Sequence, residues 1–259
     1  DEGGNERAQL YRLDAADGRI ENLTAHPEAK HRWGGWSHDG ERFAFASNRR
    51  DESVFDVYVQ ARDGRGDDAE LVHEGDGWLS VAGWSPDDSR LVVHEAHSSF
   101  DQDVHVLDLE SGDMRHVTPH EGDVRYGSVE WSPDGEALYL TTDEGADTTY
   151  LARLDLDALD RSTVAEGGDW NVEGATIHEG TGRIVHARNV EGYTDLTVGR
   201  LADETTVEAF PEPDLPRGVY GGVDFDPDGE RFAVTVTASS HNPNVYVVDV
   251  ETGEAERWT

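Results

Sequence analysis

The sequence contains no cysteine and a single lysine, Lys30, among its 259 residues. Without cysteine it can form neither a disulfide nor a thiolate metal site, which fits an intracellular protein. It also has no run of about 18 apolar residues, so no membrane-spanning helix and no membrane partner are expected. Residues 1–6 are polar and acidic, unlike a secretory signal. A cytoplasmic location is therefore expected.

Positive charge is scarce as well, with 21 Lys and Arg against 56 Asp and Glu, a net charge of −35. The carboxylates are dispersed, so the chain repels itself in dilute buffer, whereas molar salt shortens the screening length to about 3 Å. No basic face can be assembled, and nucleic acid is not expected as a partner. The composition predicts a salt-adapted protein. Its acidic, lysine-poor habit resembles that of haloarchaeal proteins, which implies a cytoplasm rich in salt.

What the sequence does contain is an internal repeat. Its signature, in the clearest copy Trp-Ser-Pro-Asp-Gly, recurs along the chain, with one degenerate copy. The five copies begin at Trp36, Trp84, Trp131, Ile177 and Phe225, which are 48, 47, 46 and 48 residues apart. Spacing this regular indicates a repeat architecture.

Each copy of the signature predicts a β-hairpin. Pro presets φ near −65°, and Asp and Gly complete a type I turn. A short run rich in β-branched and aromatic residues follows at once and predicts a second strand. A third strand comes next, for example at residues 57–59 and 245–250. A Gly turn and a more polar fourth strand follow it. Four antiparallel strands graded from apolar to polar predict a propeller blade with its inner strand first.

The repeat predicts one all-β propeller domain over residues 1–259, with complete blades at about 33–73, 78–118, 126–166, 171–210 and 219–259. Residues 9–25 match only the third and fourth strands, because residues 10–14 align with residues 245–249. The last blade already has all four strands and cannot supply the missing two. We therefore expect five four-stranded antiparallel blades plus a two-stranded N-terminal half-blade, a fragment of a larger propeller.

The repeat resembles two known groups of propellers. The turn motif, followed by Ala-Ser-Asn-Arg at 46–49 and Asp-Val-Tyr-Val at 56–59, is similar to the repeat of TolB-type proteins. It is equally similar to the N-terminal propeller of the prolyl oligopeptidase family of serine peptidases. Residues 244–259 resemble the point where acylaminoacyl-peptidase-like and dipeptidyl-peptidase-like members pass into an α/β-hydrolase domain, which favours the peptidase. That resemblance implies about seven blades, with the hydrolase domain lying outside this chain.

The resemblance to the peptidases implies a non-catalytic propeller whose partner is the hydrolase domain of its own full-length chain. Such a propeller caps the active site and restricts access to short peptides, the expected substrates. Family catalysis needs a Gly-x-Ser-x-Gly elbow, and the sequence contains no such pentapeptide. No catalytic residue and no cofactor are therefore assigned. The alternative, which the repeat leaves open, is a TolB-like scaffold propeller that binds a protein partner and has no hydrolase attached.

Three further features suggest metal binding or catalysis, but each has a simpler structural explanation. Residues 224–229 mimic the start of a calcium loop, but its twelfth position is Thr235, inside a predicted strand, so a turn is favoured. The repeated turn acids could suggest a glycosidase pore, but each lies on a different blade. Three near pairs of histidines lack a third ligand within reach in the sequence, so solvated histidines and no metal site are expected. These pairs are His26 with His31, His94 with His97, and His116 with His120.

The tryptophans divide into two groups. Trp33, Trp36, Trp84 and Trp131 are expected to pack between neighbouring blades. Trp78 and Trp170 lie near the starts of first strands, where the inner rim of a propeller lies. Those two are the predicted ligand-contacting residues.

Overall fold

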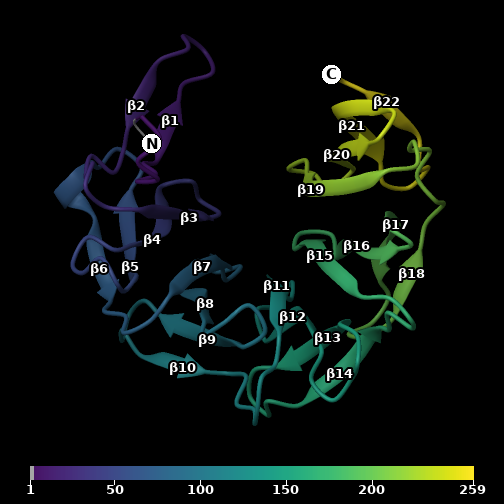
Figure 1. Ribbon diagram of the computed structural model, residues 1–259, viewed down its shortest axis with the longest axis horizontal. Coiled ribbons are helices and arrows are strands. Elements are labelled where there is room, and N and C mark those ends of the chain that lie inside the picture. Colours follow the sequence, from purple (N-terminus) through teal and green to yellow (C-terminus); the bar gives the residue numbers. More distant parts are fainter. Residues whose placement is uncertain (1–2) are drawn as a thin grey trace. The chain divides into compact units, whose positions relative to one another are not determined.

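The computed structural model describes residues 3–259, and these residues form 22 β-strands and one short 3-10 turn but no α-helix (Figure 1). The strands make five four-stranded sheets and one two-stranded sheet, all antiparallel. This confirms the predicted fold class, all-β with five blades and a half-blade. No helix of the described residues has the length and hydropathy to span a membrane. The chain divides into two compact units, which meet between Asp123 and Val124 in the sequence.

The first unit holds the half-blade and two blades. The half-blade consists of β1 (Tyr11–Leu13) and β2 (Ile20–Asn22). The first blade consists of β3 (His31–Trp36), β4 (Arg42–Ser47), β5 (Asp56–Ala61) and β6 (Glu70–His73). The second consists of β7 (Leu79–Trp84), β8 (Arg90–Ala96), β9 (Gln102–Asp108) and β10 (Met114–His116). Within the described residues, β1 pairs only with β2, as the incomplete repeat predicts.

The second unit holds three blades of the same topology. They are β11 (Tyr126–Trp131), β12 (Ala137–Thr142), β13 (Tyr150–Asp155) and β14 (Arg161–Ala165); β15 (Val172–His178), β16 (Arg183–Val190), β17 (Tyr193–Leu201) and β18 (Val207–Ala209); and β19 (Val219–Phe225), β20 (Arg231–Ala238), β21 (His241–Asp249) and β22 (Ala255–Arg257). In each blade the strands pair in sequence order.

The repeated signature closes the hairpin between first and second strands. Ser85 Oγ donates to the Asp87 carboxylate at 2.6 Å and accepts from the backbone N–H of Arg90 at 2.9 Å. Bonds from Ser85 and Ser89 lower the pKa of Asp87 to about 2. The same Ser–Asp bond, at 2.6 and 2.5 Å, recurs in the turns that begin at Ser37 and Ser132. The repeat is thus a turn motif that places each second strand.

The calcium-like stretch of the last blade is also such a turn. Residues 226–230 connect β19 to β20, and the Asp226 carboxylate accepts from the backbone N–H of Arg231 at 3.1 Å. Asp226 therefore takes the place that serine has in the other copies. The predicted twelfth position, Thr235, lies inside β20 and pairs with Val245.

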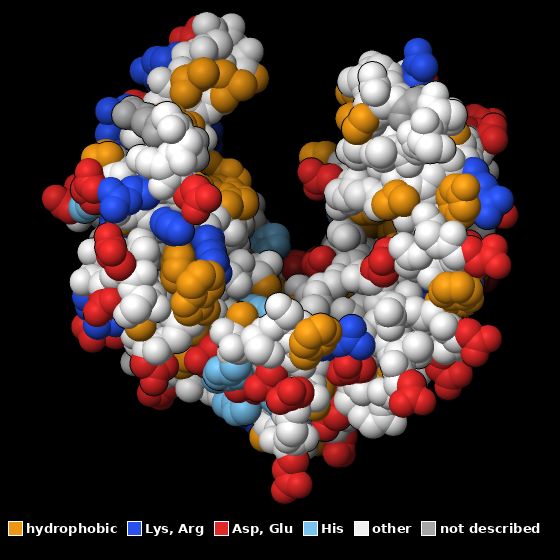
Figure 2. All heavy atoms as spheres, in the orientation of Figure 1, with side chains coloured by type: hydrophobic (Ala, Val, Ile, Leu, Met, Phe, Trp, Pro, Cys, Tyr) orange, Lys and Arg blue, Asp and Glu red, His pale blue; other side chains and the backbone are white. Residues whose placement is uncertain are grey.

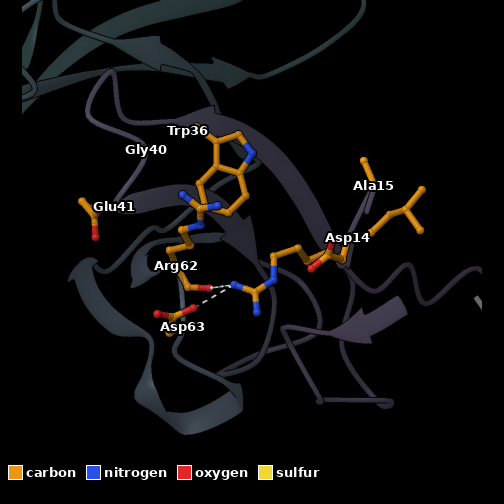
Figure 3. A pocket seen from close by; sticks show the side chains of 9 residues that line it. Asp14, Ala15, Trp36, Gly40, Glu41, Arg62 and Asp63 are labelled. Atoms are coloured by element: carbon orange, nitrogen blue, oxygen red, sulfur yellow. Dashed lines mark hydrogen bonds and ion pairs between the residues drawn. The ribbon is translucent and has the colours of Figure 1, made fainter. Parts of the chain in front are cut away.

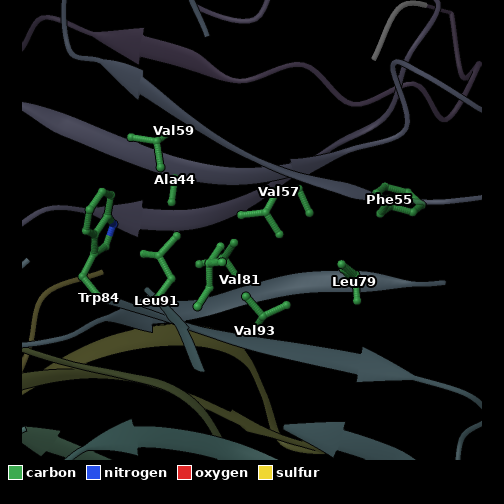
Figure 4. Packing of buried hydrophobic residues seen from close by; sticks show 11 residues of the cluster. Ala44, Phe55, Val57, Val59, Leu79, Val81, Trp84, Leu91 and Val93 are labelled. Atoms are coloured by element: carbon green, nitrogen blue, oxygen red, sulfur yellow. The ribbon is translucent and has the colours of Figure 1, made fainter. Parts of the chain in front are cut away.

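The two blades of the first unit share one apolar core, which Figure 4 shows from close by. Ala44 and Val57 of the first blade face Val81 and Val93 of the second. The strands approach closely at Gly34, where a Cβ atom would lie 2.4 Å from Val81 Cβ. No side chain larger than hydrogen fits there without displacing a neighbour.

The prediction for the four interblade tryptophans is only partly correct. Trp84 is buried, and its Nε1–H donates to the Gly35 carbonyl of the neighbouring blade at 3.0 Å. Trp131 is buried too. Trp33 and Trp36, however, are 46% and 39% exposed, so their predicted burial between blades is wrong. Trp33 stacks on Phe43 and Trp36 meets the same ring edge-on. Both stay exposed because the half-blade beside them has only two strands.

Acidic side chains are spread over the surface and do not form one patch, as Figure 2 shows for the visible face. This distribution agrees with the dispersal of carboxylates along the sequence.

Candidate functional site

The predicted ligand contacts lie where the chain enters a first strand. Each such connection is tied to the loop between the second and third strands of the preceding blade. The N–H of Phe55 donates to the Gly77 carbonyl, and the N–H of Val172 donates to the Thr149 carbonyl, both at 2.9 Å. Trp78 directly precedes β7, whereas Trp170 lies two residues before β15. The two tryptophans belong to different compact units, so they form two separate candidate sites.

Trp78 forms part of a cluster of two aromatic rings and an arginine. Its side chain is half exposed and lies against buried Phe55, with ring centroids 5.6 Å apart. The guanidinium carbon of Arg32, from β3, lies 4.2 Å from the Phe55 centroid and 4.9 Å from that of Trp78. A cation at this distance from an aromatic face is attracted by the ring quadrupole. Partial burial lowers the pKa of Arg32, but an arginine still stays charged at neutral pH.

Arg32 has no carboxylate partner among the residues that the structure describes. Aromatic faces satisfy the charge of a guanidinium but leave its N–H donors available. In a chain with a net charge of −35, an arginine without an acidic partner is unexpected. The arrangement can bind a carboxylate or a peptide carbonyl while Trp78 supplies an apolar surface.

A rigid support lies behind this cluster. The fully buried carboxylate of Asp56 accepts from Arg50 at 2.8 Å and from the N–H of Gly75 at 2.9 Å. Arg50 also donates to the Gly75 carbonyl at 2.7 Å. A Cβ at Gly75 would lie 2.2 Å from the Phe55 carbonyl oxygen, so this close approach requires glycine. The loop before Trp78 is thereby fixed to the loop that carries Phe55.

Trp170 lies in a more polar setting. It is 39% exposed. The Asn171 amide oxygen accepts from the N–H of Thr149 at 2.9 Å, and the Thr149 hydroxyl donates to the Val172 carbonyl at 2.7 Å. Gly167 lies so close that a Cβ would be 1.9 Å from the Trp170 carbonyl oxygen. The loop is well ordered by these bonds, but no cation stacks on this indole among the contacts of the described residues.

A third surface was not predicted as a site. A hollow of about 710 Å³ lies between the half-blade and the first blade (Figure 3). Arg12 crosses it and donates to the Arg62 carbonyl and the Asp63 carboxylate, both at 2.9 Å. Figure 3 shows the Arg62 side chain pointing toward the indole of Trp36. The hollow combines the exposed indole of Trp36 with charged groups, of which Arg12 and Asp63 are paired with each other.

Arg32 was not predicted as a site residue, although the repeat contains a signal for it. The residue four positions before each repeat anchor is Arg32, Ser80, Gly127, Glu173 and Gly221 in turn. Only one copy carries a cation on this inner strand. Phe55 gave no such signal, because its contact with Trp78 depends on how two blades pack.

Comparison with known proteins identifies the class. Residues 1–259 match the profile of the prolyl oligopeptidase N-terminal β-propeller domain, and the chain belongs to this family. No match was found among curated proteins.

Solved structures with the same fold include both peptidases and TolB proteins. A prolyl endopeptidase aligns over 98% of this chain and 38% of its own, with a TM-score of 0.75 and 17% identity. A puromycin-hydrolysing peptidase from Mycobacterium tuberculosis aligns over 98% and 42%, with a TM-score of 0.77 and 18% identity. TolB from Acinetobacter baumannii aligns over 97% and 62%, with a TM-score of 0.66 and 16% identity. This chain thus spans about two fifths of each of these two peptidases.

Proposed function

We propose that this chain is the non-catalytic propeller of a salt-adapted serine peptidase. It caps the active site of a hydrolase domain in the same polypeptide and restricts access to short peptides. The observation that carries the proposal is the family match over residues 1–259, in a sequence without the Gly-x-Ser-x-Gly elbow that the chemistry needs. A cap acts by steric exclusion, so it requires no catalytic group of its own.

Arg32 and Trp78 are the proposed peptide contacts within the cap. The guanidinium, held over two rings at 4.2 and 4.9 Å, offers N–H donors to a peptide carboxylate or carbonyl. The half-exposed indole offers an apolar face to a side chain. Trp170 presents a second indole, without a cation, near the start of a first strand in another blade.

The capping role is tested in the full-length protein that contains this chain. One scissile sequence is presented twice, as a short peptide and inside a long unfolded polypeptide. Capping predicts a much higher kcat/KM for the short peptide. Equal values for the two substrates would refute it.

The contact residues are tested in the same protein with single variants. Trp78→Ala should lower kcat/KM for the short peptide several-fold through loss of apolar and cation–π contact. Trp258→Ala, at a 66% exposed tryptophan just after β22, is the matched control and should change little. If the two variants behave alike, Trp78 is not a substrate contact.

The TolB likeness supports a second candidate, a propeller that binds a protein partner. The complete reading frame of the gene distinguishes the two. A Gly-x-Ser-x-Gly elbow in a domain that follows this chain supports the peptidase. A reading frame with no such domain supports the partner-binding propeller.

A further inference from the structure

Three strands of the second blade bring metal-ligating side chains to one face. In the pairing of β8 with β9, Glu95 lies directly opposite Asp103, and in that of β9 with β10, His105 lies opposite His116. Side chains two residues apart on a strand share a face, so these four residues project on the same side. Leu107, two residues beyond His105, packs into the core shared with the first blade. The cluster therefore lies on the side of the second blade that faces the first.

The functional atoms of the cluster converge. One oxygen of Glu95, one of Asp103 and one nitrogen of His105 all lie within 4.8 Å of each other. His105 Nε2 is 3.1 Å from Glu95 Oε2, and His116 Nε2 is 2.8 Å from Asp103 Oδ1. The side chains of Glu95, Asp103 and His105 are only 15%, 16% and 11% exposed. Figure 2 shows histidine side chains gathered among acidic ones over this blade.

In the described part of the chain, the two facing carboxylates are paired only with histidines. Like charges directly opposite on antiparallel strands destabilise a sheet, and Glu95 faces Asp103 in this way. Among the described residues, neither carboxylate forms an ion pair with a lysine or an arginine. Their ion-pair partners are histidines, namely His97, His105, His116 and His120. A divalent ion would neutralise both carboxylates at once and use the imidazole nitrogens as neutral ligands.

We propose that Glu95, Asp103 and His105 bind a divalent transition-metal ion of the Zn²⁺ class, with His116 as the fourth ligand. Mixed imidazole and carboxylate ligands suit Zn²⁺. Ligand atoms about 2.1 Å from a tetrahedral ion lie roughly 3.4 Å from one another. The separations of 3.1 and 2.8 Å are already close to that arrangement. Glu95, Asp103 and His105 already have ligand atoms within 4.8 Å of one another, and His116, which contacts Asp103, must move toward the other two to complete the site.

His97 supports the site from outside the proposed ligand set. Its Nε2 lies 2.9 Å from Asp103 Oδ2, the carboxylate oxygen that does not face His116, and its Nδ1 lies 3.9 Å from Glu95 Oε1. Such outer hydrogen bonds orient ligating carboxylates. The expectation that His97 and His116 are simply solvated rested on the lack of a third ligand nearby in the sequence. Strand pairing supplies that ligand.

The site is also linked to the loop that carries Trp78. A Cβ at Gly77 would lie 2.6 Å from Glu95 Oε1, so this carboxylate packs against the loop. At the end of β8, the N–H of Ala96 donates to the Trp78 carbonyl at 3.1 Å. A bound ion would therefore stiffen the entry to β7 as well as the blade.

The test uses the purified chain in molar KCl, freed of metal with a chelator and titrated with Zn²⁺ by calorimetry. We expect one equivalent to bind, with a rise in melting temperature that the chelator reverses. His105→Gln and Asp103→Asn should each weaken binding at least tenfold. His178→Gln is the matched control, because that histidine bonds Thr181 and the Pro227 carbonyl and should leave binding unchanged.

Two further measurements keep the proposal open to refutation if a variant folds poorly. Mg²⁺ at the same concentration should stabilise the chain much less than Zn²⁺, since an effect of equal size would be general neutralisation of carboxylates. Co²⁺ should give the visible absorption of a four-coordinate site in the wild type and His178→Gln but not in His105→Gln. Absence of a one-to-one Zn²⁺ site, or equal Zn²⁺ affinity in His105→Gln, overturns the proposal.

Discussion

Glu130 is a glutamate that folding should keep protonated at neutral pH. It lies on β11, opposite Tyr139 of β12. Burial, with a smaller contribution from the charge of Glu179, raises the pKa of Glu130 from its ordinary value of 4.5 to about 8. Among the described residues, no hydrogen bond or ion pair to its carboxyl group compensates for the burial. The charged form is therefore costly in the folded chain.

This raised pKa makes the stability of the fold depend on pH. Between pH 4.5 and 8 the unfolded state has lost the Glu130 proton while the folded state retains it, so stability falls as pH rises. The loss grows by roughly 1.4 kcal/mol for each pH unit, or on the order of 3 kcal/mol at pH 7. Because the residue keeps partial exposure, solvent reduces this to about 1–2 kcal/mol. Glu130→Gln removes the titration and should recover that amount.

The assay compares melting temperature and urea unfolding at pH 4.5 and pH 8 in constant molar KCl. Glu130→Gln should match the wild type at pH 4.5 and exceed it at pH 8. Glu136→Gln, an exposed glutamate in the turn of the same blade, is the control and should show no such pH-dependent gain. A Glu130→Gln effect of the same size at both pH values would refute the reasoning.

Four further outcomes are expected. The melting temperature should rise from dilute to molar KCl because the net charge is −35; a flat or falling trend would contradict salt adaptation. The isolated chain should not hydrolyse aminoacyl chromogenic substrates, and turnover that a serine-directed inhibitor abolishes would overturn this. Gly34→Ala, with its Cβ 2.4 Å from Val81 Cβ, should cost about 1–3 kcal/mol in unfolding free energy, whereas Gly83→Ala, with open space around it, should cost less. Burial lowers the pKa of His186 to about 4, so the stability that this neutral histidine contributes above pH 6.5 is lost as the pH falls toward 4. In His186→Leu, the melting temperature should therefore fall less between pH 6.5 and pH 4 than in the wild type.

The second strands could be predicted from the sequence because a local motif fixes where they begin. Arg42 and Arg231, for example, start their strands directly after the Ser or Asp turn, as expected. The ends were less predictable. In the β16–β17 hairpin, Glu191 and Gly192 both take positive φ, and this tight turn extends the pairing to Val190 and Tyr193. In this hairpin, the conformation of the turn therefore sets the length of the two strands, which continue beyond the apolar residues that predicted them.

The pairing register of the first strands could not be predicted from the local sequence pattern. Each of the five shows a register shift where it pairs with the second strand, as between Trp33 and Trp36 and between Gly221 and Val223. A bulge adds an unpaired residue and changes which side chains share a face. The exposure of Trp33 and Trp36 has a different origin, the absence of two strands beside them. Both effects arise from neighbouring strands, so reading one strand at a time could not predict them.

The same reasoning explains why the sequence analysis did not predict the cluster at Asp103, although it singled out His97 and His116. His97, His105 and His116 are far enough apart in sequence that no metal motif joins them. They meet because the β8–β9 hairpin pairs Glu95 with Asp103 and the next pairs His105 with His116. Since side chains alternate between faces, a shift of either register by one residue would carry its partner to the other side of the blade. The cluster therefore depends on the registers of two strand pairs, β8 with β9 and β9 with β10, and it can be recognised only when all three strands are paired.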